Sequence, residues 1–258
     1  HPKLLLPYSV VLIPDINEVS AQFLKLVRES GKQLIVMNVN QKLSFEQSRV
    51  LGIQLERIET DNAGAYLFTR EKEIFRHFRG KDWIFVTGAV GLTTAGGWEP
   101  LLPYVEKGEF GPAERAYGYR PTEMGTVLTQ GKVTLITWAL GELYQQYGYQ
   151  DHKLVLLDLL DKLCPDVRVL STHAHPSVEL FWDAVEDGFL LQALNLSGFN
   201  GITVERPVPM QNVKITVPFE AREVLSLDGS PVQIKRTEKG TQVCIERLDR
   251  FAAVILKN

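Results

Sequence analysis

Three apolar runs with the character of buried strands end at residues that could take part in chemistry. These residues are Asp15, Asn38 and Gly88. In an open α/β sheet, a cysteine or serine nucleophile stands on a tight turn between a strand and a helix, with a histidine paired to it. The turn that begins at Gly88 reads Gly-Ala-Val-Gly, so alanine and valine occupy the place of the nucleophile. We therefore predict no nucleophilic catalysis at this turn.

Other reactive groups have no partners at a useful spacing. Cys164 precedes a proline and Cys244 lies inside an apolar run, which is neither a disulfide framework nor a zinc spacing. His173 and His175 could face one side of an extended chain as two metal ligands, but no third ligand follows by spacing. Neither the dinucleotide fingerprint nor the phosphate-binding P-loop is present. We predict no metal and no cofactor.

Carboxylates are plentiful in the middle of the chain. Sugar hydrolysis needs two of them across the substrate, commonly at the strand ends of an eightfold barrel. The buried strands are too few for a barrel, and the sequence gives no reason to pair any two of the six glutamates. We therefore predict no catalytic residue and interpret the glutamates as solvated loop residues. They are Glu99, Glu106, Glu109, Glu114, Glu123 and Glu142.

Aromatic residues gather around the later strands of the first half. Sugar rings stack on exposed aromatic faces, but such residues are also common in cores and interfaces, and we favour packing or subunit contact. The gathered residues are Trp98, Tyr104, Tyr117, Tyr119, Trp138, Tyr144, Tyr147 and Tyr149, of which Trp98, Tyr117, Tyr119, Trp138 and Tyr144 are the site candidates. Two alternatives stay open. One is a carbohydrate-binding module built on these rings, and the other is a small-molecule enzyme at the sheet edge near Asp15, Asn38, Trp138 and Glu142, where open sheets bind ligands.

Composition excludes several classes of partner. The net charge is -3 and the isoelectric point is about 6.0, so we predict no nucleic-acid partner. No apolar run approaches the roughly 18 residues of a membrane span, and we expect no membrane association. A signal peptide is not recognisable, which favours the cytoplasm. The chain begins with His1 instead of Met, which indicates processing or an excised domain.

The elements that would position these residues form an α/β domain at residues 1–165. Residues 9–15 and 33–38 are apolar without alternation, as in strands covered on both faces of a parallel sheet. Between them, Ser20 is a candidate helix N-cap, and Gly31 stands where a left-handed C-terminal residue is favoured. A strand, a helix and a strand within about 30 residues predict a right-handed βαβ unit.

The rest of this domain is less regular. Buried strands are predicted at 83–87 and 132–138, with a long loop at 96–121 between them. The helix predicted at 152–163 is apolar on nearly every side, so we expect the next module to cover it as well. An extended segment is predicted at 65–69, and helices are predicted at 44–51 and 142–147.

After Pro165 the helical periodicity ends, and we predict an all-β sandwich at residues 166–258. Short alternating or β-branched runs are separated there by turn residues such as Asp228-Gly229 and Lys239-Gly240. Strands are predicted at 177–185, 189–196, 212–217, 223–227, 232–235, 241–246 and 251–256.

Several motifs together resemble one family. They are the strand that ends in Pro14-Asp15, the segment from Gly131 through Tyr147-Gly148-Tyr149 to the leucine-rich helix, and Ala193 to Gly198 followed by Asn212 to Ile215. This pattern resembles the β-galactosidase trimerisation-type domain and its trailing β-module, which stand behind the barrel of bacterial glycoside hydrolases. The resemblance implies a flavodoxin-like, class I amidotransferase-like parallel sheet without catalytic residues, followed by a β-sandwich.

The chain departs from that family in two places. It opens almost directly on the Pro-Asp strand, which implies a sheet truncated at its N-terminus and a missing catalytic barrel. The region 96–121 is also more elaborate than expected. The implied role is to assemble subunits and to wall a neighbour's active site. The expected partners are therefore the enzyme's own barrel domain and other copies of the chain, and no catalytic residue is carried over.

Overall fold

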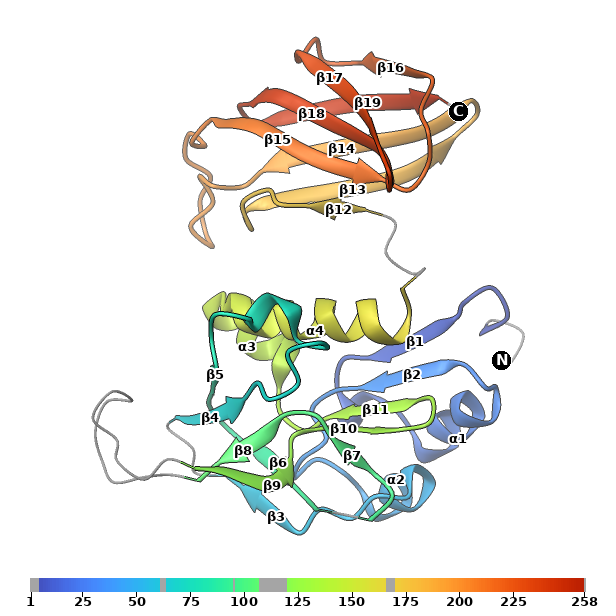
Figure 1. The fold of residues 1–258 in the computed structure, drawn as a ribbon, viewed down its shortest axis with the longest axis vertical. Helices are drawn as coiled ribbons and strands as arrows, with labels where there is room; N and C mark the ends of the chain where they lie inside the picture. The colour runs from blue at the N-terminus through green and yellow to red at the C-terminus, as the bar shows by residue number, and fades with distance from the viewer. Residues whose placement is uncertain (1–4, 61–63, 95, 107–119, 166–169, 258) are drawn as a thin grey trace. The chain divides into compact units, whose positions relative to one another are not determined.

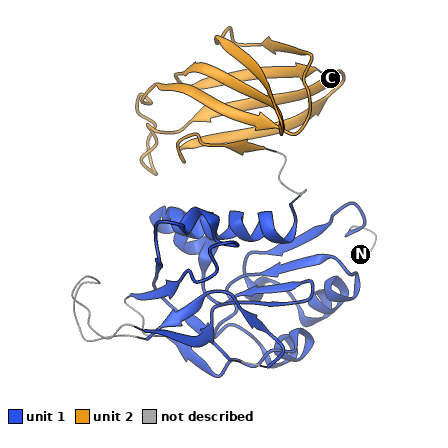
Figure 2. Ribbon diagram, viewed as in Figure 1, with its two compact units in different colours: residues 1–167 blue, residues 168–258 orange. Residues whose placement is uncertain are grey.

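The computed structural model describes residues 5–60, 64–94, 96–106, 120–165 and 170–257. The chain divides into two compact units, residues 1–167 and 168–258 (Figure 2). The sequence predicts the boundary after Pro165, two residues earlier. The order of the elements along each unit can be followed in Figure 1.

Unit 1 begins with the predicted strand, helix and strand. They are β1 (Val10–Ile13), α1 (Ala21–Glu29) and β2 (Gln33–Val36), and β1 pairs with β2 in parallel. The Ser20 hydroxyl accepts a hydrogen bond from the Phe23 amide at 3.2 Å and caps α1. Gly31 has a φ of 69°, as a left-handed residue after a helix requires. The strands, the helix with its cap and terminus, and the parallel pairing are confirmed. The expectation that residues 9–15 form a strand covered on both faces is wrong, because Leu12 of β1 is exposed.

The main sheet of unit 1 has five strands in the order β1-β2-β11-β10-β7 (Figure 1). β11 (Val133–Ile136) lies parallel to β2 and pairs antiparallel with β10 (Val127–Gln130), which in turn pairs antiparallel with β7 (Glu99–Pro100). Only a tight turn at Gly131, with a φ of 58°, separates β10 from β11. So short a connection can join only antiparallel strands. The sheet is therefore mixed, and the predicted parallel order extends over three strands.

A second, antiparallel sheet accounts for the segment at 83–87. Its order is β5-β4-β8-β9, and β5 (Trp83–Val86) pairs with β4 (Ala65–Phe68). The expectation of a strand covered on both faces is wrong here, because Trp83 is exposed at the sheet surface. The remaining strands are β8 (Pro103–Val105) and β9 (Pro121–Gly125), and a separate pair is formed by β3 (Arg57–Glu59) and β6 (Val90–Leu92).

The helices of unit 1 flank these sheets. Those after α1 are α2 (Phe45–Leu51), α3 (Leu140–Tyr147) and α4 (Gln150–Leu163), with short 3-10 turns η2 (Ile16–Glu18) and η3 (Arg76–Phe78). Val155 and Leu159 of α4 are fully buried in the core of unit 1. Coverage of α4 by the second module stays a prediction. Within the described residues, no helix is long and apolar enough to cross a membrane.

Unit 2 consists of two four-stranded antiparallel sheets around one apolar core. The first sheet contains β12 (Ser171–Thr172), β15 (Met210–Val217), β18 (Gly240–Leu248) and β17 (Val232–Thr237), and the second β13 (Val178–Val185), β14 (Gly188–Asn195), β19 (Phe251–Lys257) and β16 (Glu223–Ser226). Each of the seven predicted strands overlaps one of these. The first position of β14 requires glycine, because a Cβ at Gly188 would lie 2.1 Å from the Leu256 carbonyl oxygen.

Candidate functional site

A pocket of about 460 Å³ opens where β2 and β11 end in unit 1. We call it the edge pocket and define it by Asn38, Asn40, Lys42, Gly88, Glu142 and Tyr147. The first three residues follow β2, Gly88 follows β5, and the last two belong to α3. Open α/β sheets bind ligands at this carboxyl edge.

Polar side chains tie the ends of β1 and β2 together beside the pocket. The Asn38 amide nitrogen donates to Asp15 Oδ2 at 2.8 Å, and Lys42 Nζ contacts the same oxygen at 3.0 Å. Asn40 Nδ2 donates to Asn38 Oδ1 at 2.6 Å. Asp15 Oδ1 accepts from the Asn17 amide at 2.8 Å and so caps η2. Asn38 and Asn40 are buried, so their amides are fixed before any ligand arrives.

Asn38 has an unusual backbone conformation. Its φ is 61°, in the left-handed region that favours glycine and tolerates asparagine. The backbone N–H of Asn38 donates to the Trp138 carbonyl at 3.1 Å, and this bond joins the ends of β2 and β11. Strained residues of this kind persist where the surroundings fix them, and they cluster at ligand sites.

Asp15 is held as a carboxylate. Burial raises its pKa, but hydrogen bonds from the Asn17 backbone, Lys42 and Asn38, with the charge of Lys42, outweigh that effect and hold the pKa below its ordinary value. A general acid for sugar hydrolysis needs a raised pKa instead. Asp15 is therefore suited to organising the edge and unsuited to donating a proton.

The turn after β5 is built differently from a nucleophile elbow. It leads into strand β6, whereas an elbow leads into a helix. The Ala89 carbonyl accepts from Asn40 Nδ2 at 3.3 Å, and the Gly91 amide donates to the Thr137 carbonyl at 2.9 Å. Ala89 also lines the edge pocket, so a methyl group stands where a reactive group would be needed.

The predicted aromatic residues separate into different environments. Trp98 is 6 % exposed, and its indole nitrogen donates to the Gly52 carbonyl at 3.1 Å. Trp138 is fully buried, so neither tryptophan can stack on a ligand, and packing is the interpretation that holds for both. Tyr144 is half-buried on α3. Tyr117 and Tyr119 lie outside the described residues.

Tyr147 is the aromatic residue of the edge pocket, although the sequence analysis did not select it as a site residue. Its side chain is 53 % exposed, and its ring stacks on Tyr149 with centroids 5.2 Å apart and planes at 21°. Tyr149 stacks in turn on His152, with centroids 5.8 Å apart. The signal was the Tyr-Gly-Tyr sequence, in which Gly148 ends α3 with a φ of 65°.

His152 lies beneath this stack. Trp138 Nε1 donates to His152 Nδ1 at 3.0 Å, so Nδ1 carries no proton. Burial lowers the pKa of His152 to about 4, against smaller opposing effects of the Phe85 backbone and Asp151. The imidazole is therefore neutral at physiological pH and acts as a structural group.

A second histidine is paired with a buried carboxylate away from the pocket. His77 Nδ1 lies 2.7 Å from Asp158 Oδ1, and the His77 amide donates to Asp158 Oδ2 at 3.2 Å. Asp158 is 2 % exposed, so the pair fixes η3 against α4. The sequence could not reveal this pair, because 81 residues separate its members.

The structure therefore brings three predicted residues to one edge: Asp15, Asn38 and the exposed Glu142. An exposed tyrosine face beside a carboxylate and amides can bind a ring that carries hydroxyl groups. In the described part of the chain, no three His, Cys, Asp or Glu side chains are grouped to hold a metal ion.

Comparison with known proteins yields a fold likeness. No family model and no curated protein sequence matches the chain. It is similar in fold to α-L-fucosidase isoenzyme 2 from Paenibacillus thiaminolyticus, at 15 % identity and a TM-score of 0.72, over 97 % of this chain and 41 % of that one.

Two further structures are β-galactosidases. One, from Bacillus circulans sp. alkalophilus, is 15 % identical with a TM-score of 0.54 over 98 % of this chain and 34 % of its own. The other, a catalytic mutant of a GH42 enzyme from G. stearothermophilus, is 14 % identical with a TM-score of 0.53, and 97 % and 32 % are covered. The chain thus spans less than half the length of these proteins, with which it shares a fold.

Proposed function

We propose that the chain is the non-catalytic C-terminal accessory region of a larger glycoside hydrolase, of the trimerisation type with an amidotransferase-like sheet. Support comes from the fold likeness to a fucosidase and to β-galactosidases. The part of each of those proteins that matches this chain is less than half of its length. In that setting its partners are the barrel domain of the same enzyme and further copies of the chain.

The observation that carries this proposal is the chemistry of the edge pocket. Ala89 stands at the turn where a nucleophile would be needed, and Asp15 is committed to Lys42 and Asn38. Among the described residues that line the pocket, Glu142 is the one carboxylate. Sugar hydrolysis with two carboxylates has no basis in this arrangement.

Hydrolysis assays test the absence of catalysis. The purified chain is incubated with nitrophenyl α-L-fucoside and nitrophenyl β-D-galactoside, and we expect no release of nitrophenol above the buffer rate. Release that disappears in the Glu142→Gln variant would place a catalytic group in this chain and contradict the proposal. The Gln146→Glu variant is the matched control on the same helix.

Self-association is supported by an apolar surface on unit 2. Phe181, Leu225 and Phe251 are 44 %, 45 % and 43 % exposed, and the strand register places them on the outer face of the sheet β13-β14-β19-β16. Exposed apolar groups that share a face are typical of interfaces. Sedimentation velocity should give a mass above the 29.1 kDa of one chain, and Phe181→Ser should lower it.

The control for that experiment is Phe45→Ser. Phe45 is 77 % exposed on α2 of unit 1, and its loss should leave the sedimentation unchanged. A single 29.1 kDa species for the unmodified chain at high micromolar concentration would overturn the oligomeric part of the proposal.

Carbohydrate binding at the edge pocket is a second candidate, favoured by the exposed Tyr147 ring next to Glu142. NMR titration with galactose and fucose should shift the resonances of α3, and Tyr147→Ala should abolish the shifts. The control is Tyr8→Ala, because Tyr8 is an exposed tyrosine outside the pocket. Tyr66 is not used for this purpose, because its ring packs on Phe85. Unchanged spectra would remove this candidate.

A further inference from the structure

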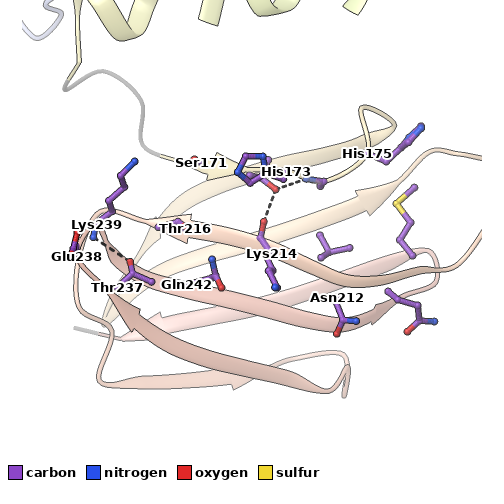
Figure 3. A pocket seen from close by; sticks show the side chains of 15 residues that line it. Ser171, His173, His175, Asn212, Lys214, Thr216, Thr237, Glu238, Lys239 and Gln242 are labelled. Carbon is purple, nitrogen blue, oxygen red and sulfur yellow. Dashed lines mark hydrogen bonds between the residues drawn. The ribbon is translucent and has the colours of Figure 1, made fainter. Parts of the chain in front are cut away.

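A groove of about 740 Å³ lies on the sheet β12-β15-β18-β17 of unit 2 (Figure 3). We call it the sheet groove and define it by His173, Asn212, Lys214, Thr216, Lys239 and Gln242. The segment after β12 and the turn between β17 and β18 form parts of its wall. All of these residues belong to unit 2.

The alternation of β15 places its polar side chains in the groove. Val213, Ile215 and Val217 are buried in the core, so Lys214 and Thr216 point to the opposite face. Gln242 of β18 lies directly opposite Thr216 in the ladder. Rigid strands therefore present these groups side by side.

Asn212 has an unusual backbone conformation at one end of the groove. The register of β15 with β18 is the same on both sides of Asn212, with Gln211 opposite Arg247 and Val213 opposite Ile245. Asn212 has a φ of 54°, the left-handed conformation of a strained residue. Strained residues of this kind persist where the surroundings fix them, and they cluster at ligand sites.

Several polar groups of the groove are free to bind. Two hydroxyls of the groove are already engaged. The Thr172 hydroxyl donates to the Lys214 carbonyl at 2.7 Å, and the Thr237 hydroxyl donates to the Gly240 carbonyl at 2.9 Å. Among the described residues, the side chains of Lys214, Thr216 and Gln242 have no such partner. Lys214 is exposed and lacks an ion pair in that part of the chain.

The balance of charge in the groove is positive. Lys214 and Lys239 face one carboxylate, that of Glu238, and two imidazoles stand at His173 and His175. Among the described residues that line the groove there is no phenylalanine, tyrosine or tryptophan on which a sugar ring would stack. Hydroxyl and amide groups around an unpaired ammonium fit a ligand that carries both hydroxyls and carboxylates.

We propose that the sheet groove binds an acidic oligosaccharide, a sugar chain that bears carboxylate groups. Lys214 pairs with a carboxylate, while Thr216 and Gln242 bond to sugar hydroxyls. This site lies on the sheet β12-β15-β18-β17 of unit 2. It is independent of the accessory role proposed above, which rests on the edge pocket of unit 1, on the apolar face of the sheet β13-β14-β19-β16 and on the shared fold.

Calorimetric titration of the full chain with tetragalacturonate tests the proposal. We expect binding that weakens as salt is added, because an exposed lysine provides part of the attraction. Lys214→Met should lower the affinity about tenfold, which corresponds to one lost charge-assisted hydrogen bond. Gln242→Ala removes a neutral hydrogen bond and should lower the affinity about threefold. Lys257→Met, on β19 of the opposite sheet, is the matched control and should change it less than twofold.

Each of the following results would overturn the proposal. They are no heat with tetragalacturonate, equal affinity for the Lys214→Met variant, and equal binding of a neutral galactose tetramer. Equal binding of tetraglutamate would also overturn it, because charge without hydroxyls would then suffice. Thermal unfolding of each variant establishes that unit 2 remains folded.

Discussion

The Asn38 side chain donates a hydrogen bond to Asp15 across 2.8 Å and thereby links the ends of two parallel strands. Asp15 also caps η2 and binds Lys42. One carboxylate thus holds together three segments that meet at the edge pocket.

The Asp15→Asn variant should be less stable than the unmodified protein by about 1 to 2 kcal/mol at pH 6 to 7, the size of a lost cap or a charge-assisted bond. The folded protein lowers the pKa of Asp15, so its stabilisation exists above the unfolded pKa and is lost as the pH falls through the folded value. The two urea unfolding curves should converge as the pH falls from about 5 toward 3. A difference independent of pH would contradict this.

Asn38 should be replaced with less loss by glycine than by alanine. Both changes remove the bonds to Asp15 and Asn40, but only alanine adds the strain of a Cβ at a φ of 61°. We expect Asn38→Ala to lower the free energy of unfolding about 1 kcal/mol more than Asn38→Gly does. Equal urea midpoints would show that the left-handed conformation relaxes in the variants.

His152 should make stability depend on pH in the mildly acidic range. Its folded pKa is about 4 and its unfolded pKa about 6.5, so between these values the unfolded chain binds a proton that the folded chain does not. Stability therefore falls as the pH falls, by roughly 2 kcal/mol between pH 6.5 and 5 for this group.

The His152→Gln variant should be less stable at pH 7 but should lose most of that slope. Urea unfolding followed by tryptophan fluorescence at both pH values measures the difference. His173→Gln, at an exposed position of unit 2, should keep the full slope. An unchanged slope in His152→Gln would assign the pH dependence to other groups.

Gly91 should not tolerate a methyl group. A Cβ there would lie 2.7 Å from the Val39 carbonyl oxygen and 2.9 Å from Leu55 Cδ1. Gly91→Ala should cost about 1 to 3 kcal/mol of stability, as overpacking usually does. Gly80→Ala is the matched control, because nothing lies within 4 Å of its Cβ position. A thermal midpoint of Gly91→Ala equal to that of the control would contradict the close packing of β6.

The sequence predicted the elements with strong local signals. The strands of unit 2 alternate and are separated by glycine turns, and α1 has its Ser20 cap and Gly31 terminus. The missed strands β7, β8 and β9 contain Pro100, Pro103 and Pro121, and proline argues against a strand in a sequence pattern. The antiparallel β10 was also missed, because only the Gly131 turn marks its hairpin.

The parts of the candidate site that could be predicted are the residues that the order of the parallel strands brings together. Asp15 and Asn38 end neighbouring parallel strands, so their meeting follows from the βαβ unit. The burial of Trp98 and Trp138 could not be predicted, because their acceptors, Gly52 and His152, are not apparent from the sequence. Tyr147 differs from them only in its exposure, which the sequence does not report.

The parallel pairing of β2 with β11 also affects how the protein reaches its native state. Leu34 pairs with Val133, nearly a hundred residues later in the chain. Closing so long a loop is entropically costly and slows folding. During synthesis, β2 therefore waits for its neighbour until most of unit 1 has left the ribosome, and the edge pocket is among the last features of that unit to form.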